Sequence, residues 1–259
     1  MVTTELLPDL ASEPERLVAL EAVHNFRDLG GYATADGRTT RWRTLFRADG
    51  LYRLTAADVV LLEPLGLRTV IDLRSAPELD ERGRFPVDVH PVVFHHLPIV
   101  DATWADVERP KYERDEDFLI WAYQEMLTIG APRFAKAFEA LAEPDALPAV
   151  FHCAAGKDRT GLLAALLLGS LGVAHDDIVA DYALTVEGMA RFRVWAAREW
   201  PEWSARMASM PPAFTAALPE AMRHIIDELC AEHGTVRNYV RSIGVSDATL
   251  VTLESVLLD

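Results

Sequence analysis

A cysteine and an arginine, Cys153 and Arg159, stand six residues apart with Gly156 midway between them. The apolar residues 149–151 lead into the cysteine, and a helix-forming run begins near Thr160. A strand end, a tight loop and a helix start would therefore surround one thiol. Backbone N–H groups at a helix start bind anions, and the same environment favours the nucleophilic thiolate form of a cysteine. This spacing predicts phosphate-ester chemistry through a cysteine.

Each residue of the loop has an expected role in that chemistry. Cys153 would attack as the thiolate, and the planar fork of Arg159 would bind two phosphate oxygens. The loop amides would stabilise the charge that develops in the transition state. The Thr160 hydroxyl would bond the thiolate or cap the helix, and His152 would orient the loop by hydrogen bonds. The residues expected to bind phosphate are Ala154, Ala155, Gly156, Lys157, Asp158 and Arg159.

The alternative for Cys153 is an ordinary buried cysteine, which is a common fate of this residue type. The glycine, lysine, aspartate and arginine that follow it favour catalysis instead. Cys230 lies in an apolar helical run and is expected in the core. Two cysteines make no disulfide framework or zinc site, and their low number fits a reducing compartment. No metal or other cofactor is expected.

Length and charge limit the classes of protein to consider. The chain has 259 residues, half of them hydrophobic, which suits one α/β domain with or without a lid. The net charge of −15 and the lack of a basic patch exclude a nucleic-acid-binding face. No apolar run reaches the roughly 18 residues of a membrane span, and residues 1–20 do not resemble a secretory signal. We expect a cytoplasmic protein, or one secreted without a signal peptide.

The hydrophobic pattern predicts strands alternating with helices, which is typical of an α/β sheet with parallel pairing. Residues 160–171 are apolar on nearly all faces and should form a central, buried helix. Residues 1–20 should be a leader that packs on the domain or frays, within a single domain over residues 1–259. Strands are expected over 44–48, 68–73, 92–97 and 149–151, and helices over 55–65, 114–129, 131–142, 160–171, 175–184, 219–233, 235–242 and 246–258.

Charged residues lie in or beside the apolar strands, namely Arg27, Asp28, Arg47, Asp72 and Arg74. Buried charges are usually paired. We expect an ion-pair network beneath the loop, with Asp72 and Arg74 as supporting residues and direct substrate contact as the alternative. The adjacent residues His95 and His96 point to opposite faces of a strand, so a metal site is not expected there.

The His-Cys-x5-Arg-Thr pattern of residues 152–160 resembles the signature of the protein tyrosine phosphatase superfamily. Its Gly-Lys-Asp-Arg-Thr-Gly form resembles the bacterial branch similar to mycobacterial tyrosine phosphatase B. Residues 25–28, 45–47 and 72–78 are similar to further motifs of that branch. The resemblance implies a tyrosine-phosphatase-like sheet, no metal, and a phosphocysteine intermediate hydrolysed by water. It implies a phosphorylated protein or a phosphoinositide as substrate.

The leaving oxygen needs a proton, and therefore a general acid. Many tyrosine phosphatases carry it on a Trp-Pro-Asp loop before the cysteine, but here Trp200-Pro201-Glu202 follows the cysteine. The resemblance implies Asp158 as the acid, and we favour it over Asp101, which would be the acid or support Arg159. If Asp158 is not the acid, it is a carboxylate in the first turn of the helix, where it interacts favourably with the helix dipole. If Asp101 has no catalytic role, it is a solvated loop carboxylate. Lys157 would contact an extra phosphate, or be a solvated surface lysine.

Residues 186–218 are rich in tryptophan and methionine and are broken by Pro201 and by Pro211-Pro212. Trp203, Met207, Met210 and Phe214 are spaced by 4, 3 and 4 residues, which predicts a helical stripe. Core packing explains most such stripes, whereas the resembling branch has a helical lid over its active site. We favour a lid.

The favoured function is a cysteine-dependent phosphatase for phosphotyrosine, with phosphoserine, phosphothreonine and phosphoinositides as further substrates. A rhodanese-like sulfurtransferase also holds a cysteine in an anion-binding loop, but the Lys-Asp-Arg-Thr ending is foreign to it. A non-catalytic phosphate-binding module would normally have lost Cys153 or Arg159, and both are present.

Overall fold

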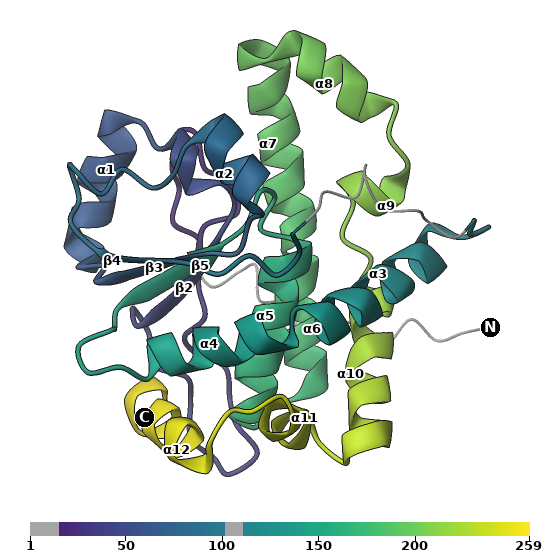
Figure 1. The fold of residues 1–259 in the computed structure, drawn as a ribbon. Helices are drawn as coiled ribbons and strands as arrows, with labels where there is room; N and C mark the ends of the chain where they lie inside the picture. Colours follow the sequence, from purple (N-terminus) through teal and green to yellow (C-terminus); the bar gives the residue numbers. More distant parts are fainter. Residues whose placement is uncertain (1–15, 102–110) are drawn as a thin grey trace.

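A five-stranded sheet in the order β1-β2-β5-β3-β4 forms the centre of the computed structural model, which describes residues 16–101 and 111–259 (Figure 1). β2, β5, β3 and β4 run parallel, and β1 pairs antiparallel with β2. The prediction of a mainly parallel sheet flanked by helices is confirmed. The strands are β1 (Arg27–Asp28), β2 (Leu45–Ala48), β3 (Thr69–Asp72), β4 (Val93–His96) and β5 (Ala149–His152).

Helices cover both faces of this sheet, so the central strands are buried on both sides. Phe46, Val70 and Val150 pack on the side of α1 (Ala56–Leu62) and α2 (Ala76–Arg82). Ile71 and Phe151 belong to the larger core on the opposite face. The helices of that face are α3 (Asp115–Ile129), α4 (Ala131–Leu141), α5 (Asp158–Ser170), α6 (His175–Ala183), α10 (Pro219–His233), α11 (Val236–Ser242) and α12 (Asp247–Leu257).

The helices expected on that face and at residues 55–65 are confirmed to within about two residues, and local capping explains several of their ends. Thr55 and Asp58 form a capping box at the start of α1, and Gly66, with φ of 61°, ends the 3-10 turn that follows. α5 is buried along most of its length, as its apolar sequence predicts.

The helix α2 was not predicted. The Ser75 side chain accepts a hydrogen bond from the backbone N–H of Glu78, and the Glu78 carboxylate accepts one from the backbone N–H of Ser75. These two bonds make a second capping box. The sequence therefore contains a sufficient local signal for a helix start at residues 75–78. This signal was missed because it directly follows a predicted strand. This helix matters because it presents Glu78 beside the loop that carries Cys153.

Residues 186–218 lie within three helices, α7 (Thr185–Glu199), α8 (Pro201–Ala208) and α9 (Pro212–Thr215). α7 rises beside the sheet and α8 turns back from its far end (Figure 1). The expected helical stripe is divided between two helices, because α8 carries Met207 and ends at Ala208, whereas Phe214 lies on α9 beyond the expected break at Pro211-Pro212. Proline lacks the N–H group that would continue the helix and favours a first turn instead.

The expected leader at residues 1–20 is described only from Arg16 onward; residues 1–15 lie outside the described part of the chain. Arg16 is 2% exposed and donates a hydrogen bond to the carbonyl of Asp28 at 2.9 Å. Leu17 forms an antiparallel bridge with Arg27, so this part of the leader packs on the domain. Within the described ranges, every helix is too short or too polar to span a lipid bilayer.

Candidate active site

The loop that carries Cys153 lies at the carboxyl end of β5, the middle strand, and leads directly into α5. Ligands of open parallel sheets bind at this edge. Gly156 has φ of +66°, and a Cβ there would lie 2.6 Å from the carbonyl oxygen of Ala48. The Gly156 carbonyl accepts hydrogen bonds from Asn25 Nδ2 at 3.1 Å and from Arg47 Nη2 at 2.8 Å. The loop is therefore held from beneath in a conformation that only glycine adopts easily.

Arg159 is fixed by Glu78, the last residue of the 72–78 motif, to which sequence analysis assigned no role. Its Nη1 and Nη2 donate to Oε2 and Oε1 of Glu78 at 2.5 and 2.9 Å. Glu78 also accepts a hydrogen bond from the backbone N–H of Ser75. This pairing uses one N–H group of each Nη atom, so the other N–H donors of the guanidinium take no part in it.

Pairing with Arg159 keeps the carboxyl group of Glu78 ionised. Burial alone would raise the pKa of Glu78, but the hydrogen bonds and charge of Arg159 outweigh burial and lower the pKa to about 2. Glu78 therefore stays ionised at any ordinary assay pH. Since its ordinary pKa is 4.5, the pair stabilises the fold above that pH and the stabilisation is lost as pH falls toward 2.

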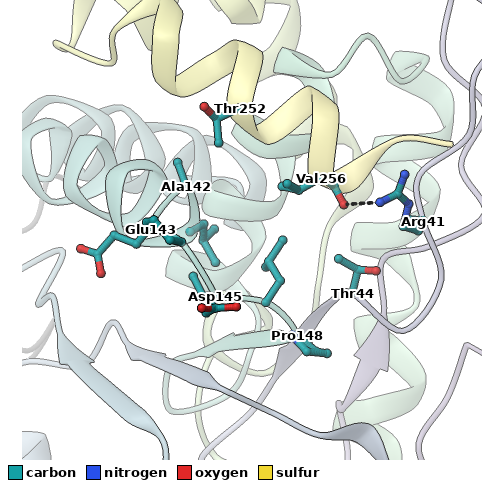
Figure 2. A pocket seen from close by; sticks show the side chains of 12 residues that line it. Arg41, Thr44, Ala142, Glu143, Asp145, Pro148, Thr252 and Val256 are labelled. Atoms are coloured by element: carbon teal, nitrogen blue, oxygen red, sulfur yellow. Dashed lines mark hydrogen bonds between the residues drawn. The ribbon is translucent and has the colours of Figure 1, made fainter.

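A cavity of about 320 Å³ opens over the loop at Ala154 and Ala155. A larger cavity, of about 450 Å³, lies near Thr44 and Pro148, which precede β2 and β5 (Figure 2). The larger cavity is thus at the amino ends of the parallel strands, the edge opposite to Cys153. The smaller cavity lies at the same edge of the sheet as Cys153 and is lined by Ala154 and Ala155, which follow the cysteine.

A model of the tyrosine phosphatase family matches residues 18–259. The chain belongs to this family. It is a phosphatase of the protein-tyrosine type, so the sulfurtransferase and non-catalytic alternatives are not retained.

Three relatives and structures illustrate the similarity. A relative from Cupriavidus necator, whose name places it provisionally among the tyrosine-protein phosphatases, is 34% identical and covers 86% of this chain and 82% of its own. The triple specificity protein phosphatase PtpB of Mycobacterium tuberculosis is 29% identical and covers 92% of this chain and 98% of its own. The core catalytic domain of a PP-IP phosphatase from S. cerevisiae has a TM-score of 0.38 at 14% identity, covering 74% of this chain and 98% of its own.

In this phosphatase the thiol lies deep in the site, since Cys153 is 2% exposed. His152 has its Nδ1 atom 3.2 Å from the Cys153 carbonyl oxygen, and burial lowers the pKa of His152. A neutral ring therefore packs beneath the cysteine. Thr160 is buried and its hydroxyl has no hydrogen-bond partner among the described residues, so it does not cap α5.

The two candidate general acids of the phosphatase lie in different surroundings. Asp158 Oδ1 accepts a hydrogen bond from the Tyr123 hydroxyl at 2.8 Å, and the Tyr182 hydroxyl lies 2.6 Å from that of Tyr123. Burial raises the pKa of both tyrosines, which keeps them protonated. Asp101 is exposed and is the last described residue before residue 111. Asp158 is thus fixed beside the loop, whereas Asp101 is a surface carboxylate.

The Lys157 side chain points away from solvent. It is 1% exposed, and its ammonium donates to the carbonyls of Ala213 at 2.6 Å and Ala216 at 3.0 Å. The solvated-lysine alternative is therefore wrong. To reach an extra phosphate the ammonium would have to leave both carbonyls and the carboxylate of Asp158, which lies 3.4 Å away.

The expected ion-pair network is present beneath the loop, and its centre is a residue that sequence analysis missed. The buried carboxylate of Asp181 binds Arg27 at 2.9 Å and Arg47 at 2.5 Å. Burial by itself would raise the pKa of Asp181. The charges of Arg27 and Arg47 outweigh burial and hold that pKa well below its usual range. Through Arg47 this cluster reaches the Gly156 carbonyl.

Asp72 and Arg74 form a separate buried pair at 2.5 Å, with His152 Nε2 at 3.5 Å from Asp72. Asp28 belongs to neither cluster. It accepts backbone hydrogen bonds from Gly30 and Arg43, and burial raises its pKa to about 6. Asp28 therefore shapes the turn after β1, near the charges of Arg16 and Arg43 and outside the two clusters described.

Replacing Glu78 with glutamine should lower kcat/KM on the order of tenfold, because Arg159 would lose one face of its support and with it the fixed orientation of the fork. Binding of vanadate, measured as a competitive Ki, should weaken by a similar factor. A purely structural role would lower the melting temperature without weakening vanadate binding. Glu81→Gln, an exposed change on the same helix, is the matched control and should alter neither quantity.

Proposed function

We propose that this phosphatase hydrolyses phosphotyrosine in proteins through a phosphocysteine intermediate. The observation that carries the proposal is the placement of the Glu78-supported Arg159 fork and the Gly156 loop around Cys153, at the carboxyl edge of the central strand. Nucleophile, clamp and anion-binding amides then converge on one phosphate.

The proposed reaction has two steps. The Cys153 thiolate attacks phosphorus, the phosphorus–oxygen ester bond breaks, and the leaving phenolate oxygen takes a proton from Asp158, with Asp101 as the alternative donor. A water molecule then attacks phosphorus, the sulfur–phosphorus bond breaks, and inorganic phosphate and the thiolate are released. The carboxylate formed in the first step takes the proton of that water.

The walls of the cavity support an aromatic ester as substrate. One wall is apolar and comes from α7, α8, α9 and the segment between the last two, with Met189, Phe192, Met207, Met210 and Phe214 as its residues. Methionine sulfur and aromatic edges pack well on an aromatic ring. We therefore also propose that residues 186–218 act as the lid of this site. The M. tuberculosis relative is named a triple specificity protein phosphatase. Phosphoserine, phosphothreonine and phosphoinositides are retained here as further candidate substrates.

A substrate panel tests the proposal. Phosphotyrosine peptides and aryl phosphates should be hydrolysed faster than phosphoserine peptides, alkyl phosphates and short-chain phosphoinositides, because only the aryl esters fill the apolar wall. Rapid acid quenching after mixing with labelled aryl phosphate should trap label on a peptide that contains Cys153. Equal rates for alkyl and aryl esters would remove the case for the lid, and label on any other residue would refute the intermediate.

A further inference from the structure

The cavity over the loop has a polar wall opposite its apolar one. Tyr52, Arg53 and Asp49 come from the segment after β2, while Glu78 and Arg82 come from α2. The charges on this wall are of both signs. Whether each is already neutralised within the protein decides what the wall can bind.

Three of the four charged side chains on this wall already have partners within the protein, namely Arg53, Asp49 and Glu78. Arg53 forms a close ion pair with Asp49 and donates to the carbonyl of Ala22 at 2.9 Å. Asp49 also accepts the backbone N–H groups of His24 and Asn25. Glu78 is engaged by Arg159, as described above.

Arg82 is the exception. Its Nη1 donates to the Tyr52 hydroxyl at 3.3 Å, and its Nε lies 4.0 Å from a carboxylate oxygen of Glu81, a side chain that is 73% exposed. The Arg82 side chain is itself 31% exposed. Among the described arginines that line the cavity, Arg82 is thus the one whose guanidinium has no close carboxylate partner.

The position of Arg82 relative to the phosphate site follows from the helix. Glu78 and Arg82 are four residues apart on α2, so their side chains leave one face of the helix about 5–6 Å apart. Glu78 holds Arg159. A cation therefore lies about one helical turn from the phosphate clamp, along the polar wall.

We propose that Arg82 binds a carboxylate that flanks the phosphorylated residue, so that the substrate is a phosphotyrosine peptide with an acidic neighbour. This inference rests on the proposed phosphotyrosine phosphatase function. The ring of the substrate packs on the apolar wall, its phosphate enters the loop, and the neighbouring carboxylate meets the Arg82 fork.

A phosphoinositide headgroup fits this wall less well. Several phosphates need several cations, and here Arg53 is bound to Asp49 while the Lys157 ammonium is bound to backbone carbonyls. Asp49 and Glu78 would also face any additional phosphate. One available cation beside an apolar wall suits a single carboxylate next to an aromatic ester.

Two phosphotyrosine peptides that differ only in Glu or Gln beside the phosphotyrosine test the proposal. The wild-type enzyme should prefer the Glu peptide in kcat/KM by about fivefold, the value of a partly exposed ion pair. Arg82→Met should bring this ratio to about one, and Arg82→Lys should keep part of it. Arg84→Met, a change to an exposed arginine just beyond α2, is the matched control and should keep the whole ratio.

The ratio separates recognition from folding, because damage to α2 would slow both peptides alike. An unchanged ratio in Arg82→Met, or no preference in the wild type, would overturn the proposal. So would Arg82-dependent hydrolysis of a short-chain phosphoinositide without any peptide preference, since the subsite would then belong to a headgroup. If the wild type hydrolysed neither peptide while cleaving other phosphomonoesters, the phosphotyrosine function itself would fail and this inference with it.

Discussion

Cys153→Ser should lower the turnover of every phosphomonoester on the order of 10⁴-fold or more. A serine hydroxyl does not ionise near neutral pH, so no anionic nucleophile remains, and loss of the nucleophile is the costliest single change in enzymes of this kind. The Arg159 fork and the loop amides remain in place. Steady-state rates with p-nitrophenyl phosphate, together with the affinity for inorganic phosphate, measure the two effects separately.

The second cysteine supplies the control for this change. Cys230 lies on α10, with its Sγ atom 3.7 Å from His175 Nε2 and no role at the loop. Cys230→Ser should therefore retain wild-type rates. Residual activity of Cys153→Ser within tenfold of wild type, or a comparable loss in Cys230→Ser, would refute the assignment of the nucleophile.

The phosphate loop could be recognised from sequence because its chemistry is local. Cys153, Gly156 and Arg159 lie within seven consecutive residues, between a short apolar strand and a helix that is apolar on nearly all faces. Strands of this kind place the following loop at one edge of a parallel sheet whatever the details of packing. The fold class and most helices followed from the same local patterns.

The residues that support the loop were less accessible, because contacts between distant segments select them. Asp181 was an unremarked carboxylate in an apolar helical run, and only the fold brings it to Arg27 and Arg47. Glu78 reaches Arg159 across 81 positions of the chain. A carboxylate surrounded by buried apolar neighbours was the available signal for Asp181, since such groups need a cationic partner.

The Lys157 side chain also shows that contacts between distant segments limit prediction from sequence. Its place in the motif suggested a phosphate ligand, whereas its ammonium is committed to the carbonyls of α9 and the residue after it. A motif fixes where the backbone of a residue lies. A long side chain then takes whichever partner the packed elements present, and here that partner lies 56 residues further along the chain.

Asp158→Asn should lower kcat on the order of 10²- to 10³-fold for esters with poor leaving groups, such as phenyl phosphate, because the departing oxygen would leave unprotonated. The loss should be much smaller for p-nitrophenyl phosphate, whose leaving group needs little assistance. Asparagine keeps an oxygen that accepts the Tyr123 hydroxyl bond, so the change removes the acidic proton and the carboxylate charge that lies 3.4 Å from the Lys157 ammonium.

The pH dependence of the rate provides a second, independent test of Asp158 as the general acid. A general acid works only while protonated, so its deprotonation makes the rate fall on the basic side of the pH–rate profile. Asp158→Asn should flatten that basic limb while leaving the acidic limb, which follows thiolate and substrate ionisation, in place. Asp101→Asn is the matched comparison: its carboxylate is exposed, and its substitution should leave the profile intact. Transfer of the flattened limb to Asp101→Asn would make Asp101 the acid, and a basic limb that survives both changes would exclude both aspartates.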